Sequence, residues 1–343
     1  MILDRWKYLY HLVIEIAKLE PWNRYWDGDF FVVKTDTKDE PYYITIMGRN
    51  GQCKAIGVYY GQRGLYDLFR ASTDRFPYVS PSYLMGITDG VCCYYESDRD
   101  QVPYENMEII DKCGFDFDDG EYIYFVEFLK GYFPSFISED NLEDIISVYE
   151  GLLYCLNYML ENNFEPDFDD NEIMYCSRDK HCNWKIAVID KPYPDNDIYD
   201  CDVRLSESEV EKLAQLDENN RELAVDMDYL FVPCDNNFGL GNGKEFNLLA
   251  LVFYDLTNDQ LLDMAYVLPF ENELEKLLDN LVGIFEKHGL YSSIVARNPY
   301  VLNTLFPLCE ALDIELFEGE VDYIDDIYDD IRNMSNEHEK LMS

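Results

Sequence analysis

Residues 29–72 constrain the fold of this chain more than any other stretch. Three runs rich in β-branched and aromatic residues, at 30–35, 42–47 and 55–60, are separated by turn-forming residues. Leu65, Leu68 and Phe69 then recur at helical spacing, so a helix can fold back over one face of the three strands. The pattern predicts an α+β unit that contains an antiparallel meander.

Helical patterns flank this meander on both sides. Residues 3–19 have an amphipathic pattern, and residues 104–115 are predicted to form a short helix closed by Gly114. A long helix is predicted at 138–163, with Ser138 as its N-cap. Strands are predicted at 83–88, 122–129, 172–177, 184–190 and 229–232. Ser206 and Glu209 form a capping box that begins another helix.

The last hundred residues have the order β-β-α-β-α-β. Strands are predicted at 246–254, 261–268, 293–296 and 314–317, with helices at 271–288 and 299–312 between them. Asn298 and Pro299 are a typical start for the second of these helices. A very acidic terminal helix follows, with Val321, Ile324 and Ile327 on one stripe.

A length of 343 residues favours two domains, and 48% hydrophobic residues are enough to build their cores. We predict an α+β domain with an antiparallel sheet at residues 1–135. A region of bridging helix, strand pair and linker follows at 136–245, then a mixed-sheet ββαβαβ domain at 246–332 and a disordered tail at 333–343.

The formal net charge is −42, from 27 basic and 69 acidic residues. Affinity for nucleic acid comes largely from Lys and Arg that neutralise phosphates, so direct nucleic-acid binding and binding to anionic membranes are disfavoured. Two interpretations stay open. The acidic surface either engages a basic protein or serves only to keep the protein in solution.

The chain has ten cysteines, several of them inside apolar runs where they act as small buried hydrophobes. The first residues lack the pattern of a secretory signal, and no run approaches the ~18 apolar residues that span a bilayer. A reducing compartment fits this cysteine usage, so we expect a cytoplasmic location.

Four segments invite a metal or phosphate interpretation, and none has the required spacing. The acidic runs at 116–121 and 168–172 lack the register of a calcium loop. Cys176, His181, Cys182 and Cys201 match no usual zinc pattern. The glycine-rich stretch at 239–245 precedes a strand and therefore offers no helix N-terminus to a phosphate. We expect no metal and no cofactor.

The order of the last hundred residues, with Asp255 at the end of the first strand, resembles a reduced ribonuclease-H-like core, the fold of integrases and transposases. The resemblance implies carboxylates that hold paired divalent ions. It would place an acid at the strand end where this chain has Arg297 and Asn298, and a cation there cannot ligate magnesium. We take Arg297 and Asn298 as candidate binding residues. Under the alternative catalytic interpretation, Asp255, Glu320 and Asp322 supply the carboxylates.

The whole chain resembles a family of bacterial two-domain proteins of unknown function. Three features carry the likeness: Pro21 and Trp22 after the first helix, the GYFPSF segment at 131–136, and the segment IVARNPYVLNTLFPLCEALDIEL at 294–316. The similarity covers about residues 1–317 and implies a two-domain architecture, without an activity or site residues.

These patterns predict a non-catalytic acidic binding or adaptor protein that engages a basic protein partner. No serine elbow or cysteine–histidine pair is visible, and the four histidines (His11, His181, His288 and His338) are not paired in the sequence. The alternative is a metal-dependent phosphodiesterase or nuclease, degenerate at Arg297, on the C-terminal domain.

Overall fold

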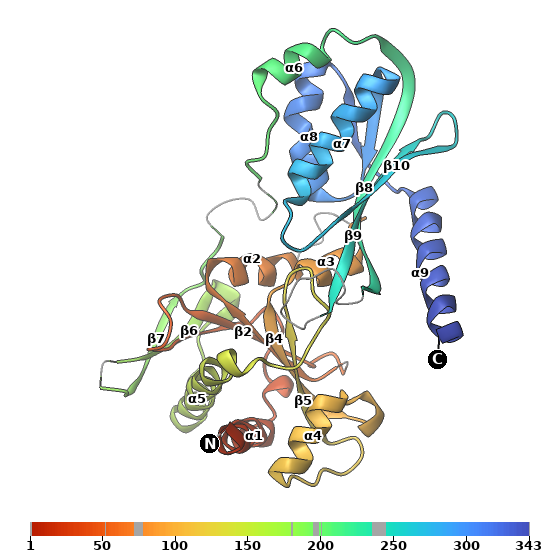
Figure 1. Cartoon of the computed structure of the whole chain (residues 1–343). Coiled ribbons are helices and arrows are strands. Elements are labelled where there is room, and N and C mark those ends of the chain that lie inside the picture. Colours follow the sequence, from red (N-terminus) through yellow and green to blue (C-terminus); the bar gives the residue numbers. More distant parts are fainter. Residues whose placement is uncertain are drawn as a thin grey trace. The chain divides into compact units, whose positions relative to one another are not determined.

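The computed structural model describes residues 2–51, 53–71, 78–179, 181–194, 199, 201–234 and 245–342, which fold into two compact units (Figure 1). The first unit comprises residues 1–72, 88–129 and 134–195, and the second comprises 73–87, 130–133 and 196–343. Each unit combines helices with a mixed sheet, so the fold is α+β as predicted. The predicted intermediate region at 136–245 is divided between the two units near residue 195.

The sheet of the first unit has seven strands in the order β5-β4-β3-β2-β1-β6-β7. Neighbouring strands are antiparallel except for β1 and β6, which are parallel. The predicted meander is therefore the centre of a larger mixed sheet, which the strand pair of β6 and β7 extends. The strands are β1 (Phe31–Lys34), β2 (Tyr42–Met47), β3 (Ala55–Tyr60), β4 (Gly90–Ser97), β5 (Tyr122–Phe128), β6 (Glu172–Arg178) and β7 (Trp184–Asp190).

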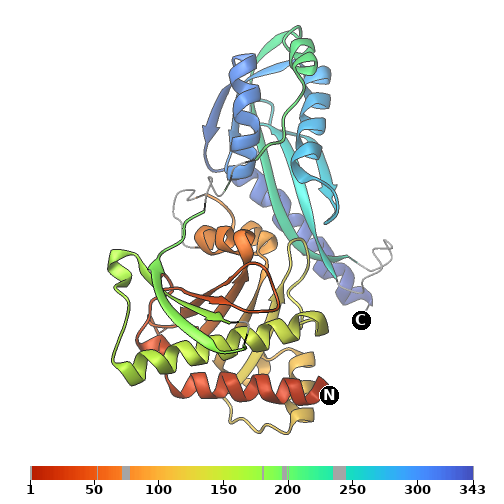
Figure 2. The same cartoon turned by 90° about the vertical axis from the view of Figure 1, so that its left-hand side faces the viewer.

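Other elements cover both faces of this sheet. Successive residues of β1 point to opposite faces and therefore join different cores. Phe31 and Val33 join the core beneath α1 (Ile2–Lys18) and α5 (Glu139–Asn162), with α4 (Tyr104–Cys113) beside them. Val32 faces the opposite side, where Leu65 and Leu68 of α2 (Gly61–Ala71) pack. Figure 2 shows α1 and α5 running side by side along the first face.

The long helix α5 lies wholly in the first unit and does not bridge two domains. It packs against α1, β1 and β6, and twelve of its 24 residues are buried. So large a buried surface requires contacts on several sides, which one unit supplies. At Gly151 the helix approaches the sheet so closely that an added Cβ would lie 2.6 Å from Val33 Cγ1 and 2.9 Å from Trp184.

The strand predicted at residues 83–88 is wrong, because this segment forms the helix α3 (Pro81–Ile87). Pro81 occupies the first helical position, which favours a helix start. Tyr83, Gly86 and Ile87 lie on one buried face at helical spacing. Gly86 contacts the ring of Tyr229 so closely that a side chain there would overlap with it. The apolar residues of this segment therefore follow a helical period.

The sheet of the second unit has five strands in the order β10-β9-β8-β11-β12. Its first strand, β8 (Glu218–Cys234), is far longer than the strand predicted at 229–232. The other strands are β9 (Phe246–Asp255), β10 (Gln260–Val267), β11 (Leu290–Ala296) and β12 (Glu315–Glu318). β8 to β10 are antiparallel, and β11 is parallel to both β8 and β12. The predicted ββαβαβ order thus gains a leading strand.

Helices cover both faces of this second sheet. A core of β8, β9 and β11 side chains packs beneath α7 (Glu273–His288) and α8 (Pro299–Leu312). On the opposite face, Val321, Ile324 and Tyr328 bring α9 (Asp322–Met342) against Ala224 and Val252. α9 extends to Met342, whereas the sequence pattern predicts a disordered tail from residue 333.

The remaining helical elements are α6 (Glu207–Leu213), which carries the predicted capping box, and the short 3-10 turns η1 (Pro21–Asn23), η2 (Arg99–Gln101) and η3 (Phe168–Asp170). Across the described parts of the chain, no helix is long and apolar enough to cross a membrane.

Two glycines inside helices provide a matched test of this packing. We expect Gly151→Ala to lower the free energy of unfolding of the first unit by about 1–3 kcal/mol, because its methyl group would overlap with Val33 and Trp184. Nothing lies within 4 Å of a Cβ at Gly283 in α7. Gly283→Ala should therefore stabilise the second unit by about 0.5–1 kcal/mol through helix propensity alone. Chemical unfolding monitored by circular dichroism measures both changes, and a neutral or stabilising Gly151→Ala would contradict the close approach.

Candidate functional site

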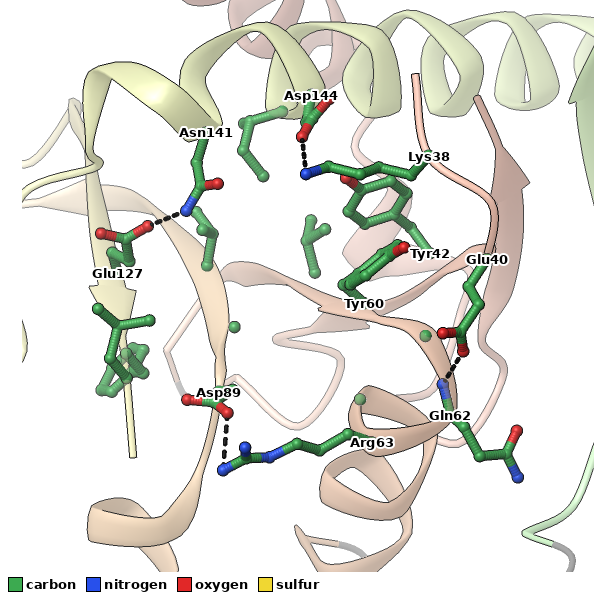
Figure 3. A pocket seen from close by; sticks show the side chains of 18 residues that line it. Lys38, Glu40, Tyr42, Tyr60, Gln62, Arg63, Asp89, Glu127, Asn141 and Asp144 are labelled. Carbon is green, nitrogen blue, oxygen red and sulfur yellow. Dashed lines mark hydrogen bonds and ion pairs between the residues drawn. The ribbon is translucent and has the colours of Figure 1, made fainter. Parts of the chain in front are cut away.

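A cavity of about 400 Å³ lies at one end of the first unit's sheet (Figure 3). Its residues come from the β1–β2 connection, the end of β3, the start of α2, the start of β4, the end of β5 and the first turns of α5. These six segments span more than a hundred positions of the chain. The topology brings them together because β2, β3, β4 and β5 are neighbours in the sheet.

The inner wall of this cavity is apolar. Val58, Val91 and Ile145 are buried and line it. Tyr42, also buried, and Tyr60, which is 39% exposed, form a tilted ring pair with centroids 4.9 Å apart. A ligand inside the cavity would therefore contact aliphatic and aromatic carbon.

Carboxylates of the chain cap both helices that begin at the cavity. Glu40 accepts a hydrogen bond of 2.6 Å from the backbone N–H of Gln62 at the start of α2. Gly61 has a φ of +65°, and an added Cβ would lie 2.7 Å from the Glu40 carboxylate, so glycine is required there. At the start of α5, Glu127 accepts a hydrogen bond of 3.4 Å from the backbone N–H of Ser138 and one of 2.6 Å from Asn141 Nδ2. The positive ends of the two helices are thus already neutralised, and they do not attract an anionic ligand.

The charged residues of the cavity form pairs and leave an excess of negative charge. Lys38 Nζ lies 3.1 Å from Asp144 Oδ2, and Arg63 Nη2 lies 2.8 Å from Asp89 Oδ2 (Figure 3). The four carboxylates that line the cavity, Glu40, Asp89, Glu127 and Asp144, outnumber the two cations, Lys38 and Arg63. Two negative charges therefore remain in excess, which favours a cationic ligand.

The polar side chains of the lining are four carboxylates, two cations, two tyrosines and two amides. Among the described residues that line the cavity there is no histidine, cysteine, serine or threonine. Burial raises the pKa of Tyr42 well above its usual value, and the adjacent charge of Asp144 adds to this effect. Tyr42 therefore stays protonated at neutral pH and cannot serve as a base.

A buried carboxylate supports the wall beneath Asp89. Asp67 is 2% exposed, accepts a hydrogen bond of 3.0 Å from the backbone N–H of Asp89, and forms an ion pair with Arg70. Burial raises the pKa of Asp67 to about 6, although Arg70 lowers it. Asp67 thus fixes the start of β4 against α2 and holds Asp89 in position.

The second unit contains a buried ionic cluster around Arg297, one of the residues selected from the sequence. The guanidinium donates to Asp226 Oδ2 from Nε at 3.1 Å and from Nη2 at 2.8 Å. It also donates to Asp325 Oδ2 from Nη1 at 2.9 Å, and Asp228 lies 4.0 Å away. Because β11 runs parallel to β8 with Val295 beside Ala224, two further residues bring Arg297 beside Asp226.

Burial controls the protonation of this cluster. Burial, together with the negative charge of Asp226, raises the pKa of Asp228 to about 7. Burial also raises the pKa of Asp226, whereas Arg297 lowers it. Attraction to Asp226 and Asp325 raises the pKa of Arg297 against the opposing effect of burial. Arg297 is therefore a permanent cation held by carboxylates.

The structure brings together some of the other residues selected from the sequence. Glu320 and Asp322 line a polar cavity of about 420 Å³ beside Arg297, Asp228 and Asp325. Asn298 is 1% exposed and has a structural role: its Oδ1 accepts from Tyr300 N at 3.0 Å, and its Nδ2 donates to the Met227 carbonyl at 2.9 Å. It caps α8 and ties that helix to β8.

Asp255 does not join this group. It is fully buried at the end of β9, where it forms an ion pair of 2.8 Å with Arg221 and accepts hydrogen bonds from Asn258 and Tyr291. Its carboxylate therefore holds the β9–β10 turn, and it is not among the described residues that line the cavity beside Arg297.

Within the parts of the chain that the structure describes, no group of three or more His, Cys, Asp or Glu side chains is placed to hold a metal ion. Cys176 is buried in the core of the first unit, whereas Cys182 is exposed. The glycine-rich stretch predicted as a loop lies outside the described residues, apart from Glu245.

Sequence reasoning missed both sets of interacting carboxylates. Leu223, Val225, Met227 and Tyr229 alternate along β8 and face one core, and this period of two was the available signal for the strand. Recognition of this alternation would have placed Asp226 and Asp228 together on the opposite face of the strand. No comparable signal exists for the cavity of the first unit, because its residues are distant in the sequence.

Two domain families each match a part of this chain. Residues 6–176 match a domain of unknown function (DUF7309), and residues 209–332 match a second domain of unknown function (DUF6930). The second match lies within the second unit. No curated protein and no solved structure matches the chain.

The raised pKa of Asp228 predicts a specific dependence of stability on pH. The ionised carboxylate is disfavoured in the folded state, so its cost is absent below about pH 4 and is fully present above about pH 7. Asp228→Asn removes this titration. The unfolding free energy of the variant relative to wild type should therefore rise by on the order of 2–4 kcal/mol between pH 4 and pH 8.

Urea unfolding at several pH values measures this difference. Asp330→Asn, which changes an exposed carboxylate on α9, is the matched control and should stay within about 0.5 kcal/mol of wild type at every pH. A difference between Asp228→Asn and wild type that is constant, or that shrinks as the pH rises, would contradict the assigned protonation.

Proposed function

We propose that this chain, which matches two domains of unknown function (DUF7309 and DUF6930), is a non-catalytic binding or adaptor protein for a basic protein partner. The cavity of the first unit is the proposed recognition site, and its ligand is a basic side chain of the partner. The observation that carries this proposal is the composition of that cavity, which combines an apolar wall with an excess of carboxylates over cations.

Lysine and arginine side chains fit this combination. Each has an aliphatic stem that gains by contact with apolar surface and a charged end that needs carboxylates or aromatic faces. Val58, Val91 and Ile145 offer the first kind of contact, and Glu40 and Asp144 offer the second. An anionic ligand would meet two uncompensated negative charges and two helix ends that are already capped.

The charge of the whole chain supports the same partner class. With a net charge of −42, the protein generates a long-range field that attracts basic proteins and raises their association rate. The same field repels nucleic acid and anionic lipid. We therefore propose that the acidic surface steers the partner and that the cavity selects it.

The alternative proposal, a metal-dependent phosphodiesterase or nuclease on the second unit, has less support. The carboxylates of Asp226 and Asp325 already bind the guanidinium of Arg297. Asp255 is engaged by Arg221 and lies apart from Glu320 and Asp322. Magnesium-dependent cleavage that is lost in Asp255→Asn would favour this alternative.

We further propose a cytoplasmic location. The described cysteines are free thiols, and six of them are buried: Cys92, Cys93, Cys113, Cys155, Cys176 and Cys309. They pack as small hydrophobes, a usage that fits a reducing compartment.

Binding of a fluorescein-labelled hexalysine peptide to the full chain tests the proposed function. Fluorescence anisotropy should show saturable binding that weakens steeply between about 50 and about 500 mM salt. Glu40→Gln keeps a hydrogen-bond acceptor for Gln62 and removes one carboxylate charge from the cavity, so it should weaken binding about fivefold.

Asp39→Asn is the matched control. It removes the same charge from the adjacent exposed position, which does not line the cavity, and should change the affinity by less than about twofold. Equal losses of affinity in the two variants would show that the peptide is held only by general attraction to an acidic surface. Absence of binding to wild type at about 50 mM salt would overturn the proposal.

A further inference from the structure

A side chain of the protein itself occupies part of the cavity of the first unit. Lys38 extends from the β1–β2 connection, and its ammonium lies 3.1 Å from Asp144 Oδ2 and 5.9 Å from the centroid of the Tyr60 ring (Figure 3). Tyr42 completes the surroundings, because its ring pairs with the Tyr60 ring and the nearby charge of Asp144 adds to the effect of burial in raising its pKa. One carboxylate and one aromatic ring therefore meet at the ammonium, and the Tyr42 ring packs beside them.

This arrangement suits an ammonium better than a guanidinium. A lysine head group is a compact charge that one carboxylate and an aromatic face can satisfy, whereas the planar fork of arginine prefers carboxylates that it can contact with several N–H groups. The second unit shows the latter pattern, because Arg297 donates from three nitrogens to Asp226 and Asp325. Among the described residues, Asp144 alone lies within ion-pair distance of the Lys38 head group.

The segment that carries Lys38 is held by polar contacts near the surface. Lys34 Nζ donates to the carbonyls of Thr35 and Lys38, and Thr35 and Thr37 share a hydrogen bond of 2.9 Å between their hydroxyls. Residues 36–40 are exposed, and the side chain of Lys38 itself is 42% exposed. Withdrawal of Lys38 would expose little apolar surface, but it would leave the buried Asp144 carboxylate without its cation until a cation of the partner replaces it.

We infer that Tyr42, Tyr60 and Asp144 form an ammonium subsite for a lysine side chain of the partner, and that Lys38 occupies this subsite in the free protein. The inference rests on the proposed function, which it deepens by naming lysine as the preferred residue. Lys38 acts as an internal competitor. A partner's lysine binds when Lys38 leaves, and the apparent affinity is reduced by the fraction of protein whose subsite is filled.

Lys38→Met tests the inference, because methionine keeps the aliphatic length and removes the ammonium. In the full chain this variant should bind the labelled hexalysine peptide about tenfold more tightly than wild type, since the competitor is gone. The gain with a hexaarginine peptide should be smaller. In an Asp144→Asn background the substitution should change hexalysine affinity by less than about twofold, because the shared carboxylate is absent.

Lys54→Met is the matched control. Lys54 forms an ion pair of 2.5 Å with Glu96 and lies 5.1 Å from the ring centroid of Trp22, so its surroundings are similar, but it does not line the cavity. The Lys54→Met variant measures how the changed net charge alone alters the affinity for hexalysine, and this change should be less than about twofold. Equal gains in Lys38→Met and Lys54→Met, or weaker binding in Lys38→Met, would overturn the inference while leaving the proposed function intact. Absence of hexalysine binding in wild type and in both variants would overturn the inference and the proposed function together.

Discussion

The burial of α5 against the sheet is the constraint on which the rest of the first unit depends. Its apolar residues pack against α1 and the strands, and each buried Leu or Ile contributes about 1.5–3 kcal/mol. Gly151 permits the helix to approach Val33 directly. This approach sets the position of the first turns of α5, where Asn141 and Asp144 reach the end of the sheet. The cavity is therefore a consequence of core packing.

Charged side chains are compensated differently in the two units. In the second unit a guanidinium is enclosed by carboxylates, and the resulting cluster ties β8, β11 and α9 together around Arg297. Removal of one partner from such a cluster would leave an unpaired buried charge, which is strongly destabilising. In the first unit the ion pairs lie at the rim of a cavity, where the cations Lys38 and Arg63 are about half exposed although Asp144 is buried. A cation that is open to solvent can be replaced by a cation of a partner, whereas the guanidinium of Arg297 is enclosed.

Much of the fold follows from local sequence patterns. The strands β1 to β3, the helix α5 and the order of the C-terminal elements agree with hydrophobic periodicity and capping residues. The strand β8 was recognised only at its end, because acidic residues interrupt its apolar positions at Asp226 and Asp228. The parallel pairing of β1 with β6 has no local signal, since it joins segments about 140 residues apart.

The candidate sites were less accessible to sequence reasoning. Arg297 was identified because a cation stood where an acid was expected, but its partners lie on the unrecognised part of β8. The residues of the first unit's cavity have ordinary identities and become notable only by proximity. Lys38, for example, is one of several lysines in polar connections until the fold brings Asp144 beside it.

Chemical cross-linking locates the surface on which a basic ligand binds. A carbodiimide that joins carboxylates to amines without a spacer can be applied to the full chain with the hexalysine peptide at low salt, and mass spectrometry then locates the modified residues. The peptide should be attached mainly to Glu40, Asp89 and Asp144 among the 69 acidic residues of the chain. Cross-links spread over the acidic surface, or concentrated at Glu320, Asp322 and Asp325, would contradict the proposed recognition site.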